Sequence, residues 1–401
     1  MLHFKKFKIY MMKISNKYHL IYICENDLSQ QIGGTIHVKE VLDSLIKLHN
    51  NITLIAPNYH DKNIDIAHGI QTIFIKTSQL RIIKWLYFYL TSTFQIFRIY
   101  LKTGKIIVYS REMSYNMFLP LLIKIFNIPL FIEVNGILLK EMEDLNYSRS
   151  AYYFTRLLEK MNFQAATHII SVSDEIKRSI NHLLKIHCNN ITVVPNGTDT
   201  NLFYPMDKDE CRKKTEVDIS KFIIGFIGSC YPYHDIDTLI KAVPNLADKI
   251  PNIHVMIVGN GYMLDKWKNL SETLGITDKI TFNGYIPYSK TNIYINSFDI
   301  CYAVYKTNVF GIGMKIMDYM SCNRPVITSQ LQAFTNILPS QDSIQFVEPE
   351  NVPSLINGIT NISNNKNNIK VTHRKFIINN YTWDHTAQNI MKVIEKTLCA
   401  A

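Results

Sequence analysis

A lysine and a carboxylate near residue 315 are the residues best suited to chemistry in this sequence. Gly311 and Gly313 precede Lys315 and Asp318. Glycines at this place can open a helix, and residues three apart share one helical face, so both side chains would lie near the helix N-terminus. A lysine there can neutralise a phosphate, and the carboxylate can accept hydrogen bonds from ribose hydroxyls. The alternative interpretation is a surface ion pair on an amphipathic helix.

A glycine-led loop follows the apolar run Phe222–Ile227. Gly228 and Ser229 come directly after this run, and His234 precedes a helix that we expect to begin at Asp235. A strand, a glycine, a short loop and a helix N-terminus together form a generic phosphate cradle. In such a cradle Ser229 would hydrogen-bond a phosphate oxygen and His234 would supply a cation. Alternatively, Asp235 only caps the helix and His234 is exposed.

Paired glycines, Gly33 and Gly34, precede a helical pattern that begins near Ile36. We expect them in a loop after the first strand, where their backbone N–H groups can approach a phosphate or a sugar closely. An ordinary flexible loop would have the same sequence signature. The chain has no GxGxxG fingerprint, so these glycines do not indicate a dinucleotide site.

Two further turns contain polar candidates. Glu133 and Asn135 lie at the end of the apolar run Leu130–Val134, and a glycine follows them. A carboxylate and an amide at a strand end would face a ligand site, although Asn-Gly is also the commonest signal for a turn. Asn196 lies in the turn Val194–Asp199, for which a hinge or a cleft wall is the functional interpretation.

The elements that must position these residues alternate between short apolar runs and helical patterns. Runs that are apolar on both faces and separated by helices are typical of a parallel sheet covered on both sides. In the first half the expected strands are His19–Cys24, Ile52–Ala56, Ile70–Ile75, Ile106–Tyr109, Leu130–Val134, Ile169–Val172 and Thr192–Val194. The pattern then restarts with Phe222–Ile227, Ile253–Val258, Ile300–Val304 and Val326–Thr328.

Helices are expected between these strands, and the loops beside them carry the candidate residues. The helical patterns are Ile36–Leu48, Leu80–Lys102, Ser114–Phe126, Ala151–Ala165, Asp235–Val243, Ile312–Ser321 and Val352–Thr360. The Asn-rich segment Ser363–Asn368 is expected to be a surface loop. The sequence therefore predicts two successive α/β domains that meet near Pro195–Pro205. Open parallel sheets bind ligands beyond the carboxyl ends of their strands, which is where the candidates lie.

Composition narrows the classes of function. The chain has 401 residues and a formal net charge of +10, which fits two domains and an anionic partner. No zinc-finger or RNA-binding signature supports nucleic acid as that partner. The seven cysteines are scattered and form no CxxC pair, so we expect no disulfide framework, no structural zinc and a cytoplasmic location. No Walker loop, Ser-His-Asp signature or His-rich cluster indicates a P-loop ATPase or a metal hydrolase.

Two stretches bear on membranes. The N-terminus is basic, but no apolar run with a cleavage site follows, so a signal peptide is not expected. Trp85–Phe97 is too short to span a bilayer, which needs about 20 apolar residues. The longer stretch Leu80–Lys102 is rich in aromatic residues and carries Arg98 one turn before Lys102. It is either an interfacial helix that docks near a lipid-linked acceptor, or a buried helix with basic ends.

Five segments, taken in chain order, resemble motifs of the retaining glycosyltransferases with the GT-B fold, of the family 4 type (glycosyl transferases group 1). They are Val193–Pro205 (VVPNGTDTNLFYP), Ile224–Ala242, Val258–Gly261, Phe282–Gly284 and Lys315–Val326 (KIMDYMSCNRPV). The C-terminal Tyr381–Asp384 resembles the family's aromatic signature before its last helix. The resemblance runs over nearly the whole chain.

The resemblance implies two Rossmann-like domains whose parallel sheets face each other across a cleft. Residues 1–197 would form the acceptor-side domain, joined by a last helix at residues 382–401 that crosses back to it. Residues 198–381 would form the domain that binds a nucleoside-diphosphate sugar. This implied architecture agrees with the α/β pattern of the strands.

The resemblance also implies roles for the candidate residues. Asp318 stands where the family has a glutamate that holds the ribose hydroxyls, and Lys315 would lie beside the diphosphate. Glu133 and Asn135 would join them as catalytic residues, with Asn135 where a histidine is often found. Eight residues before Asp318, where the family has its first glutamate, stands Phe310. The implied donor-binding residues are Gly33, Gly34, Asn196, Gly228, Ser229, His234, Gly259 and Gly313.

The implied activity is hexosyl transfer, with retention, from a nucleotide sugar to a glycan or lipid-linked acceptor in the synthesis of polysaccharides or glycoconjugates. The resemblance implies neither a metal nor a cofactor, and an anionic membrane surface would be a further partner. The implied location is cytoplasmic or peripheral on the inner face of the cell membrane. Two alternatives remain: a catalytically inactive GT-B protein that binds a glycan or a partner, and a sugar-nucleotide epimerase.

Overall fold

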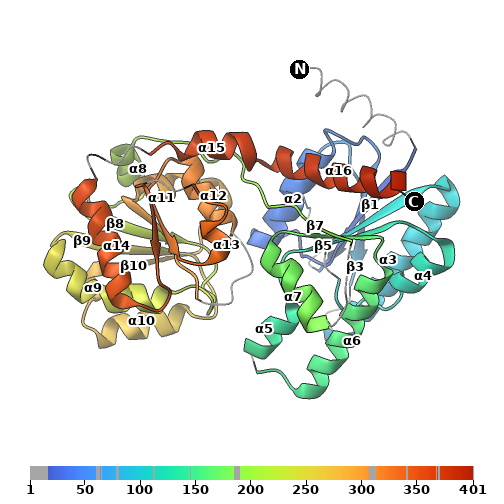
Figure 1. Cartoon of the computed structure of the whole chain (residues 1–401), viewed down its shortest axis with the longest axis horizontal. Coiled ribbons are helices and arrows are strands. Elements are labelled where there is room, and N and C mark those ends of the chain that lie inside the picture. Colours follow the sequence, from blue (N-terminus) through green and yellow to red (C-terminus); the bar gives the residue numbers. More distant parts are fainter. Residues whose placement is uncertain are drawn as a thin grey trace. The chain divides into compact units, whose positions relative to one another are not determined.

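The computed structural model divides into two compact units (Figure 1). It describes residues 17–400 except 60–63, 65, 78–80, 112, 145, 185–189, 307–312, 340–341, 367 and 369–370. Unit 1 comprises Met1–Pro195 and Trp383–Ala401, and unit 2 comprises Asn196–Thr382. Phe310 and Gly311, at the position of the family's first glutamate, lie outside the described residues, as do the N-terminal lysines and Cys188.

Unit 1 is built on a parallel sheet of seven strands in the order β3-β2-β1-β4-β5-β6-β7. Every residue of β1 and β5 is buried, because helices cover both faces of the sheet. The strands are β1 (His19–Cys24), β2 (Ile52–Asn58), β3 (Gln71–Lys76), β4 (Ile106–Arg111), β5 (Leu130–Val134), β6 (His168–Ser171) and β7 (Ile191–Val193).

Two helix layers cover the sheet of unit 1. Its helices are α2 (Gly33–Leu45), α3 (Arg81–Thr103), α4 (Leu119–Phe126), α5 (Leu138–Asp144), α6 (Arg149–Ala165), α7 (Asp174–Leu184) and α16 (Trp383–Ala400). Connections between parallel strands are right-handed, so the direction in which a helix crosses the sheet decides which face it covers. The connections that run toward β7 place their helices on one face: α3, α4, α6 and α7. Helix α2 connects β1 to β2 in the opposite direction and covers the other face. The C-terminal α16 packs beside α2. The ring of Trp383 on α16 lies 5.2 Å from that of His37.

Unit 2 has a parallel sheet of six strands in the order β10-β9-β8-β11-β12-β13. These are β8 (Phe222–Ile227), β9 (Ile253–Val258), β10 (Ile280–Gly284), β11 (Ile300–Ala303), β12 (Val326–Ser329) and β13 (Ile344–Val347). Its helices are α8 (Lys208–Lys214), α9 (Ile236–Lys249), α10 (Leu264–Thr273), α11 (Thr291–Ser297), α12 (Met314–Ser321), α13 (Gln332–Thr335), α14 (Val352–Asn365) and α15 (His373–Asn380). Two apolar clusters, one on each face of the sheet, form its core. The predicted fold class, two parallel-sheet α/β domains, is confirmed.

Several predicted boundaries were wrong for identifiable reasons. Gly33 and Gly34 form the first turn of α2 rather than a loop. The polar segment after Ser363 continues α14 to Asn365, because an exposed last turn needs no apolar residue. The sequence also failed to indicate β10 and β13, which lie at the two edges of their sheet. Their half-exposed residues weaken the apolar signal that identifies a central strand.

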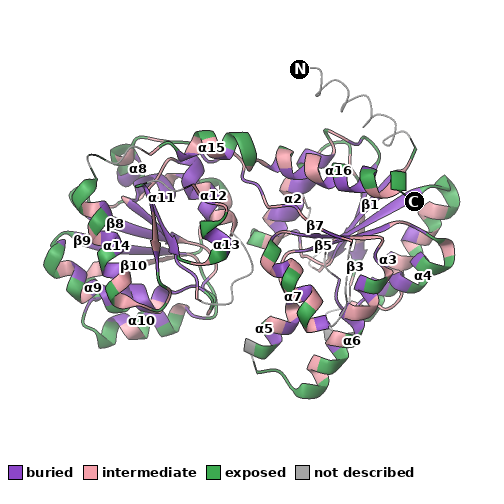
Figure 2. Ribbon diagram, in the orientation of Figure 1, coloured by how far each residue is buried: buried purple, intermediate pink, exposed green. Residues whose placement is uncertain are grey.

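Most helices of both units have a buried side and an exposed side. Figure 2 shows buried and exposed residues alternating along most of them. Within the described ranges, none of the helices combines the length and the apolar content that crossing a bilayer requires.

Candidate functional site

Lys315 and His234 form the centre of the candidate site in unit 2. Lys315 lies in the first turn of α12, and its Nζ is 3.0 Å from Nε2 of His234 and 4.0 Å from the centre of the Phe226 ring. His234 is buried and Lys315 is half-buried. Loss of hydration lowers the pKa of both side chains well below their ordinary values, and the charge of Lys315 lowers that of His234 further. His234 is therefore a neutral partner of Lys315, and the predictions that it supplies a cation or is exposed are wrong.

Two glycines let the loops after β8 and β9 pack closely beside this lysine. Gly228 and Gly259 have φ of +150° and +139°, which strain any residue with a side chain. A Cβ on Gly228 would lie 2.6 Å from Nζ of Lys315, and one on Gly259 would lie 1.9 Å from the carbonyl oxygen of Gly228. Ser229, the next residue of the loop, is half-buried. The glycines thus keep free the space in which the Lys315 amine lies.

Asp318 lies one turn after Lys315 on α12 and turns toward the start of unit 2. Its Oδ1 accepts a hydrogen bond of 2.6 Å from the hydroxyl of Thr198, a buried residue two positions after Asn196. Burial raises the pKa of Asp318 to about 7, although the Thr198 hydroxyl and the Lys315 charge oppose the rise. No ion pair joins Lys315 to Asp318 in the described part of the chain, so the alternative of an exposed surface pair is wrong.

Gly313 caps the N-terminus of α12 with an extended backbone. A Cβ at this position would lie 2.3 Å from the hydroxyl oxygen of the buried Tyr305. The absence of a side chain at Gly313 therefore lets the start of α12 lie against Tyr305, two residues after β11. A helix N-terminus and a lysine together favour an anion.

Glu133 is the centre of a buried polar cluster at the carboxyl end of β5 in unit 1. Its carboxylate accepts hydrogen bonds from the Tyr109 hydroxyl at 2.8 Å and the Asn135 amide at 3.0 Å. Nε2 of His37, from α2, lies 2.8 Å from Oε1 of Glu133. Burial alone would raise the pKa of Glu133. This effect of burial is outweighed by the charge and hydrogen bond of His37, by the charge of Arg111 and by the hydrogen bond from the Asn135 amide. Together they lower the pKa of Glu133 to about 2.

Arg111 brings a permanent charge to the same edge of the sheet. Its Nη1 donates a hydrogen bond of 2.6 Å to Oδ1 of Asn26, in the loop after β1. A Cβ on Gly34 would lie 3.0 Å from Nδ2 of Asn26 and 3.5 Å from Nη1 of Arg111. Gly34 is half-buried and Gly33 is exposed. The second glycine of the pair thus allows α2 to begin against the Asn26–Arg111 pair.

Glu25 adds a second carboxyl group to this edge, directly after β1. The Tyr89 hydroxyl, from α3, donates a hydrogen bond of 2.5 Å to it. Burial raises the pKa of Glu25 to about 7, against the opposing effects of Tyr89 and Arg111. Glu25 and Asn26 come directly after β1, whereas Arg111 and Glu133 lie at the carboxyl ends of β4 and β5. These three strands are neighbours in the sheet.

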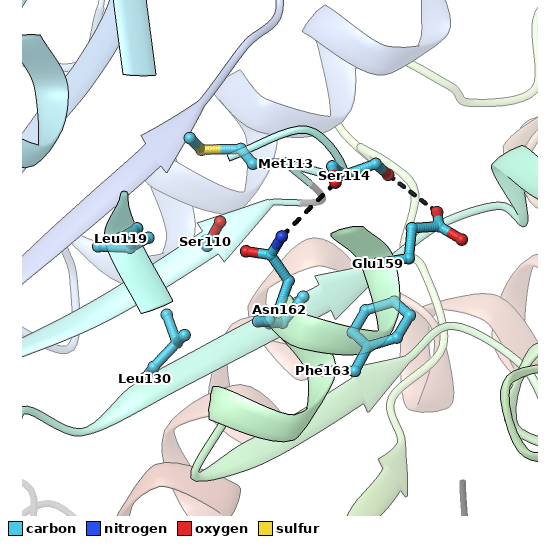
Figure 3. Close-up of a pocket in the computed structure, with 9 residues that line it drawn as sticks. Ser110, Met113, Ser114, Leu119, Leu130, Glu159, Asn162 and Phe163 are labelled. Atoms are coloured by element: carbon cyan, nitrogen blue, oxygen red, sulfur yellow. Dashed lines mark hydrogen bonds between the residues drawn. The ribbon is translucent and has the colours of Figure 1, made fainter. Parts of the chain in front are cut away.

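A separate small cavity lies deeper in unit 1 (Figure 3). In Figure 3, Glu159 and Asn162 of α6 point toward Ser114. The Ser114 hydroxyl donates a hydrogen bond of 2.9 Å to Glu159. The carbonyl oxygen of Ser114 accepts a hydrogen bond of 3.5 Å from the Asn162 amide. Burial raises the pKa of Glu159 to about 7. None of the predicted site residues lines this cavity.

The sequence-predicted residues therefore fall into two groups. Unit 2 brings together Gly228, His234, Gly259, Gly313, Lys315 and Asp318. Unit 1 brings together Glu133 and Asn135, and Gly34 lies close to Asn26 and Arg111. Sequence reasoning missed His37, Arg111, Glu25 and Thr198. Arg111 and Glu25 lie at or directly after strand ends, so the rule that ligands bind beyond the carboxyl ends of strands would have found them. The sequence held no comparable signal for His37.

Two family models match the chain. The model described as "Glycosyltransferase Family 4" matches residues 32–202, and the model described as "Glycosyl transferases group 1" matches residues 207–383. Their boundary falls close to the junction between the two units. The matched ranges contain all the predicted site residues.

Curated relatives are distant. An uncharacterized glycosyltransferase of Methanocaldococcus jannaschii is 23% identical over 249 residues, which are 59% of this chain and 62% of the relative. The phosphatidylinositol N-acetylglucosaminyltransferase GPI3 subunit of Saccharomyces cerevisiae is 21% identical over 228 residues, which are 56% of this chain and 50% of the relative. The chain thus spans between one half and two thirds of the length of these relatives.

Solved structures resemble the whole chain. Sucrose-phosphate synthase from Thermosynechococcus elongatus superposes with a TM-score of 0.78 at 16% identity, over 96% of this chain and 100% of that one. Anabaena HepE, solved in complex with UDP-glucose, superposes with a TM-score of 0.73 at 13% identity, over 94% and 99% of the two chains. At sequence identities this low, the structural similarity shows that the fold is shared.

Proposed function

Because this chain belongs to the family 4 type of GT-B glycosyltransferases, we propose that it transfers a hexose from a nucleoside-diphosphate sugar to a glycan or lipid-linked acceptor. The single observation that carries the proposal is the contact of Lys315 with His234 beside the N-terminus of α12 and the Gly228 loop. A lysine side chain beside a helix N-terminus is a site for an anion. A diphosphate is the anion that this family's donors bring.

The diphosphate is the part of the donor that these groups would bind. Negative charge develops on the leaving diphosphate as the sugar departs, and preorganised donors stabilise such charge best. Lys315 and the N–H groups that follow Gly313 would supply the positive potential, with Gly228, Ser229 and Gly259 forming the wall beside them. This assignment uses protein groups alone, so neither a metal nor a cofactor is part of the proposal.

Asp318 would bind the ribose of the donor. Its Oδ1 already accepts a hydrogen bond from Thr198, which fixes the carboxyl group and leaves Oδ2 for a ribose hydroxyl. Asn196, two positions before Thr198, would also contact the donor. A diol that binds here would favour the ionised carboxyl group over the protonated one, because hydroxyl donors stabilise a carboxylate.

Unit 1 would serve the acceptor. Glu133 is ionised at neutral pH, because its pKa is lowered to about 2, so it can accept hydrogen bonds but cannot act as an acid. We assign it the role of orienting the Asn135 amide toward the reacting sugar. Gly33 and Gly34 would bind the donor through their N–H groups at the start of α2. Retention of configuration is proposed from the family alone.

The product would be a polysaccharide or glycoconjugate assembled at the cytoplasmic side of the membrane. Among the relatives, the yeast subunit is named for a phosphatidylinositol substrate. The cysteines that the structure describes are all free, and five of the six are buried, which supports a reducing compartment. An anionic membrane surface is a further proposed partner.

The experiment that tests this function has two stages. A thermal-shift screen against nucleoside diphosphates and their sugars identifies the donor, because a ligand that binds only the folded chain raises its unfolding temperature. The selected donor, radiolabelled in the sugar, is then incubated with the protein and a glycan or lipid-linked acceptor. Donor binding without transfer or hydrolysis would indicate an inactive binding protein. Conversion to an epimeric nucleotide sugar would indicate an epimerase.

A further inference from the structure

We propose that the outer face of helices α3 and α4 docks on the surface of an anionic lipid bilayer. We call this surface the α3–α4 face. Its apolar residues are Leu86, Leu90, Phe94, Leu101, Leu121 and Ile125, and its basic residues are Arg98, Lys102 and Lys124. The proposal goes beyond glycosyl transfer and does not depend on it, because it concerns the surface on which the protein acts.

Helix α3 has two apolar faces, of which the sheet can cover only one. Its inner face, with Phe88, Tyr89, Ser92 and Ile96, is buried. On the other side Leu86, Leu90, Phe94 and Leu101 are 51%, 54%, 56% and 65% exposed. Their spacing of four, four and seven residues places them on one stripe. At 1.5 Å per residue this stripe is roughly 22 Å long.

Helix α4 extends the exposed surface. Leu121 and Ile125 on α4 are 58% and 72% exposed. The ring of Phe126, next to Ile125, lies 5.1 Å from Phe97 and 5.4 Å from Tyr100 of α3. The two helices thus pack side by side in one layer, and both carry exposed residues (Figure 2). Contiguous apolar patches of this kind mark interaction surfaces on soluble domains.

The charges of the face identify its partner. The sequence of α3 contains four basic residues and no acidic residue, and that of α4 contains one lysine and no acidic residue. Arg98, Lys102 and Lys124 are exposed, and none of them forms an ion pair with another described residue. Apolar side chains flanked by unpaired cations match the acyl chains and phosphates at an anionic lipid surface. Two copies of this face in a symmetric dimer would instead bring their cations together.

Helix α3 also links this face to the candidate acceptor side of unit 1. Tyr89, on the inner face of α3, donates a hydrogen bond to Glu25 at the carboxyl end of β1. Leu90, the next residue, lies on the exposed stripe. Docking by the outer face of α3 would therefore leave only this helix, about 10 Å in diameter, and the Tyr89 side chain between the lipid headgroups and Glu25. A lipid-linked acceptor would be presented to unit 1 from that surface.

The test is sedimentation of the full chain with sucrose-loaded vesicles at low salt. We expect the wild-type chain to pellet with equimolar phosphatidylglycerol and phosphatidylcholine, and much less with phosphatidylcholine alone. Leu90→Glu combined with Phe94→Glu should weaken binding at least about tenfold, and Lys102→Gln about fivefold. Ile378→Glu changes an exposed apolar residue of α15 in unit 2 and should bind as the wild type does.

A second measurement keeps the proposal testable if the double variant does not fold. Phe94→Trp replaces one exposed aromatic residue with another and adds a fourth tryptophan to the chain. The emission that it adds to that of the wild type should be quenched by brominated phosphatidylglycerol. Absence of pelleting with anionic vesicles, unchanged binding by a folded double variant, or unquenched emission from the Phe94→Trp variant would each overturn the proposal. So would a wild-type dimer that the double variant converts to a monomer. Vesicle binding needs neither donor nor turnover, so its failure leaves the proposed glycosyl transfer untouched.

Discussion

Nζ of Lys315 lies 3.0 Å from Nε2 of His234, so two basic side chains are in hydrogen-bond contact at the N-terminus of α12. The contact is stable because His234 is neutral and offers a lone pair to the lysine. Such an arrangement costs free energy until an anion arrives, because the ammonium group lacks the hydration it would have in water. We therefore propose that Lys315 is held ready for the diphosphate of the donor.

Lys315→Met should lower turnover at least about tenfold, because a charge-assisted hydrogen bond to phosphate contributes about 1.5–3 kcal/mol. The unfolding temperature without donor should change little, since methionine keeps the apolar stem that packs on Phe226. Steady-state kinetics and thermal unfolding check both statements. Lys268→Met removes an exposed lysine of α10 and should leave both unchanged. Full turnover in the Lys315 variant would remove this residue from the mechanism.

Donor binding should take up a proton in the pH range over which the Lys315 amine titrates. Burial lowers the pKa of Lys315 well below its ordinary value, and a diphosphate favours the protonated form. Affinity should therefore fall as pH rises. Titration calorimetry in two buffers of different ionisation enthalpy should give different binding enthalpies. Lys315→Arg keeps its charge at every such pH, so its enthalpies should agree; equal enthalpies for the wild type would contradict the idea.

Gly228→Ala should impair donor binding more than folding. The new Cβ would lie 2.6 Å from Nζ of Lys315 and displace the amine. Gly275→Ala is a matched control, because Gly275 also has a positive φ, of +67°, but a Cβ there meets no atom within 4 Å. Both variants should lose about 1–2 kcal/mol of stability from backbone strain. Only Gly228→Ala should weaken donor binding in a thermal-shift titration.

Asp318→Asn should flatten the dependence of stability on pH. The folded-state pKa of Asp318 is raised from 3.8 to about 7, so its stabilising effect is complete below pH 3.8 and is lost as pH rises through about 7. Asparagine cannot ionise and retains an oxygen for the Thr198 hydroxyl. Urea unfolding of both proteins across this range should show the curves diverging toward pH 7, with the variant the more stable. Parallel curves would show that folding does not raise the pKa of Asp318.

Glu133→Gln should destabilise unit 1 by about 1.5–3 kcal/mol at neutral pH, because it weakens hydrogen bonds to a charged group. The pKa of Glu133 is lowered from 4.5 to about 2. Its contribution is therefore present above pH 4.5 and is lost as pH falls toward 2, and the difference between the two proteins should shrink over that window. Glu143→Gln, at a surface pair with Lys140, should cost less than about 1 kcal/mol. Denaturant titrations monitored by circular dichroism measure these differences.

Local sequence patterns were sufficient for most of the central strands. His19–Cys24, Leu130–Val134, Phe222–Ile227 and Ile253–Val258 have the predicted bounds, because a strand buried on both faces must be continuously apolar. Edge strands β10 and β13 lack that constraint and were missed. Gly34 and Gly228 were predicted to let backbone N–H groups approach a phosphate or a sugar. The structure gives each glycine another role: Gly34 allows α2 to begin against Arg111, and Gly228 leaves space for the Lys315 side chain.

The sequence by itself determined the two parallel sheets and the loops in which polar residues would gather. Burial on both faces requires strands that are continuously apolar, and parallel strands present all their carboxyl ends at one edge. Only the tertiary structure decided which side chains meet there. Lys315 and His234 are 81 positions apart, and Glu133 takes a partner from α2 that no spacing rule indicates. Pairings of this kind depend on how helices pack across a sheet, and so do the pKa values, because hydration is lost only when the core closes around a charge.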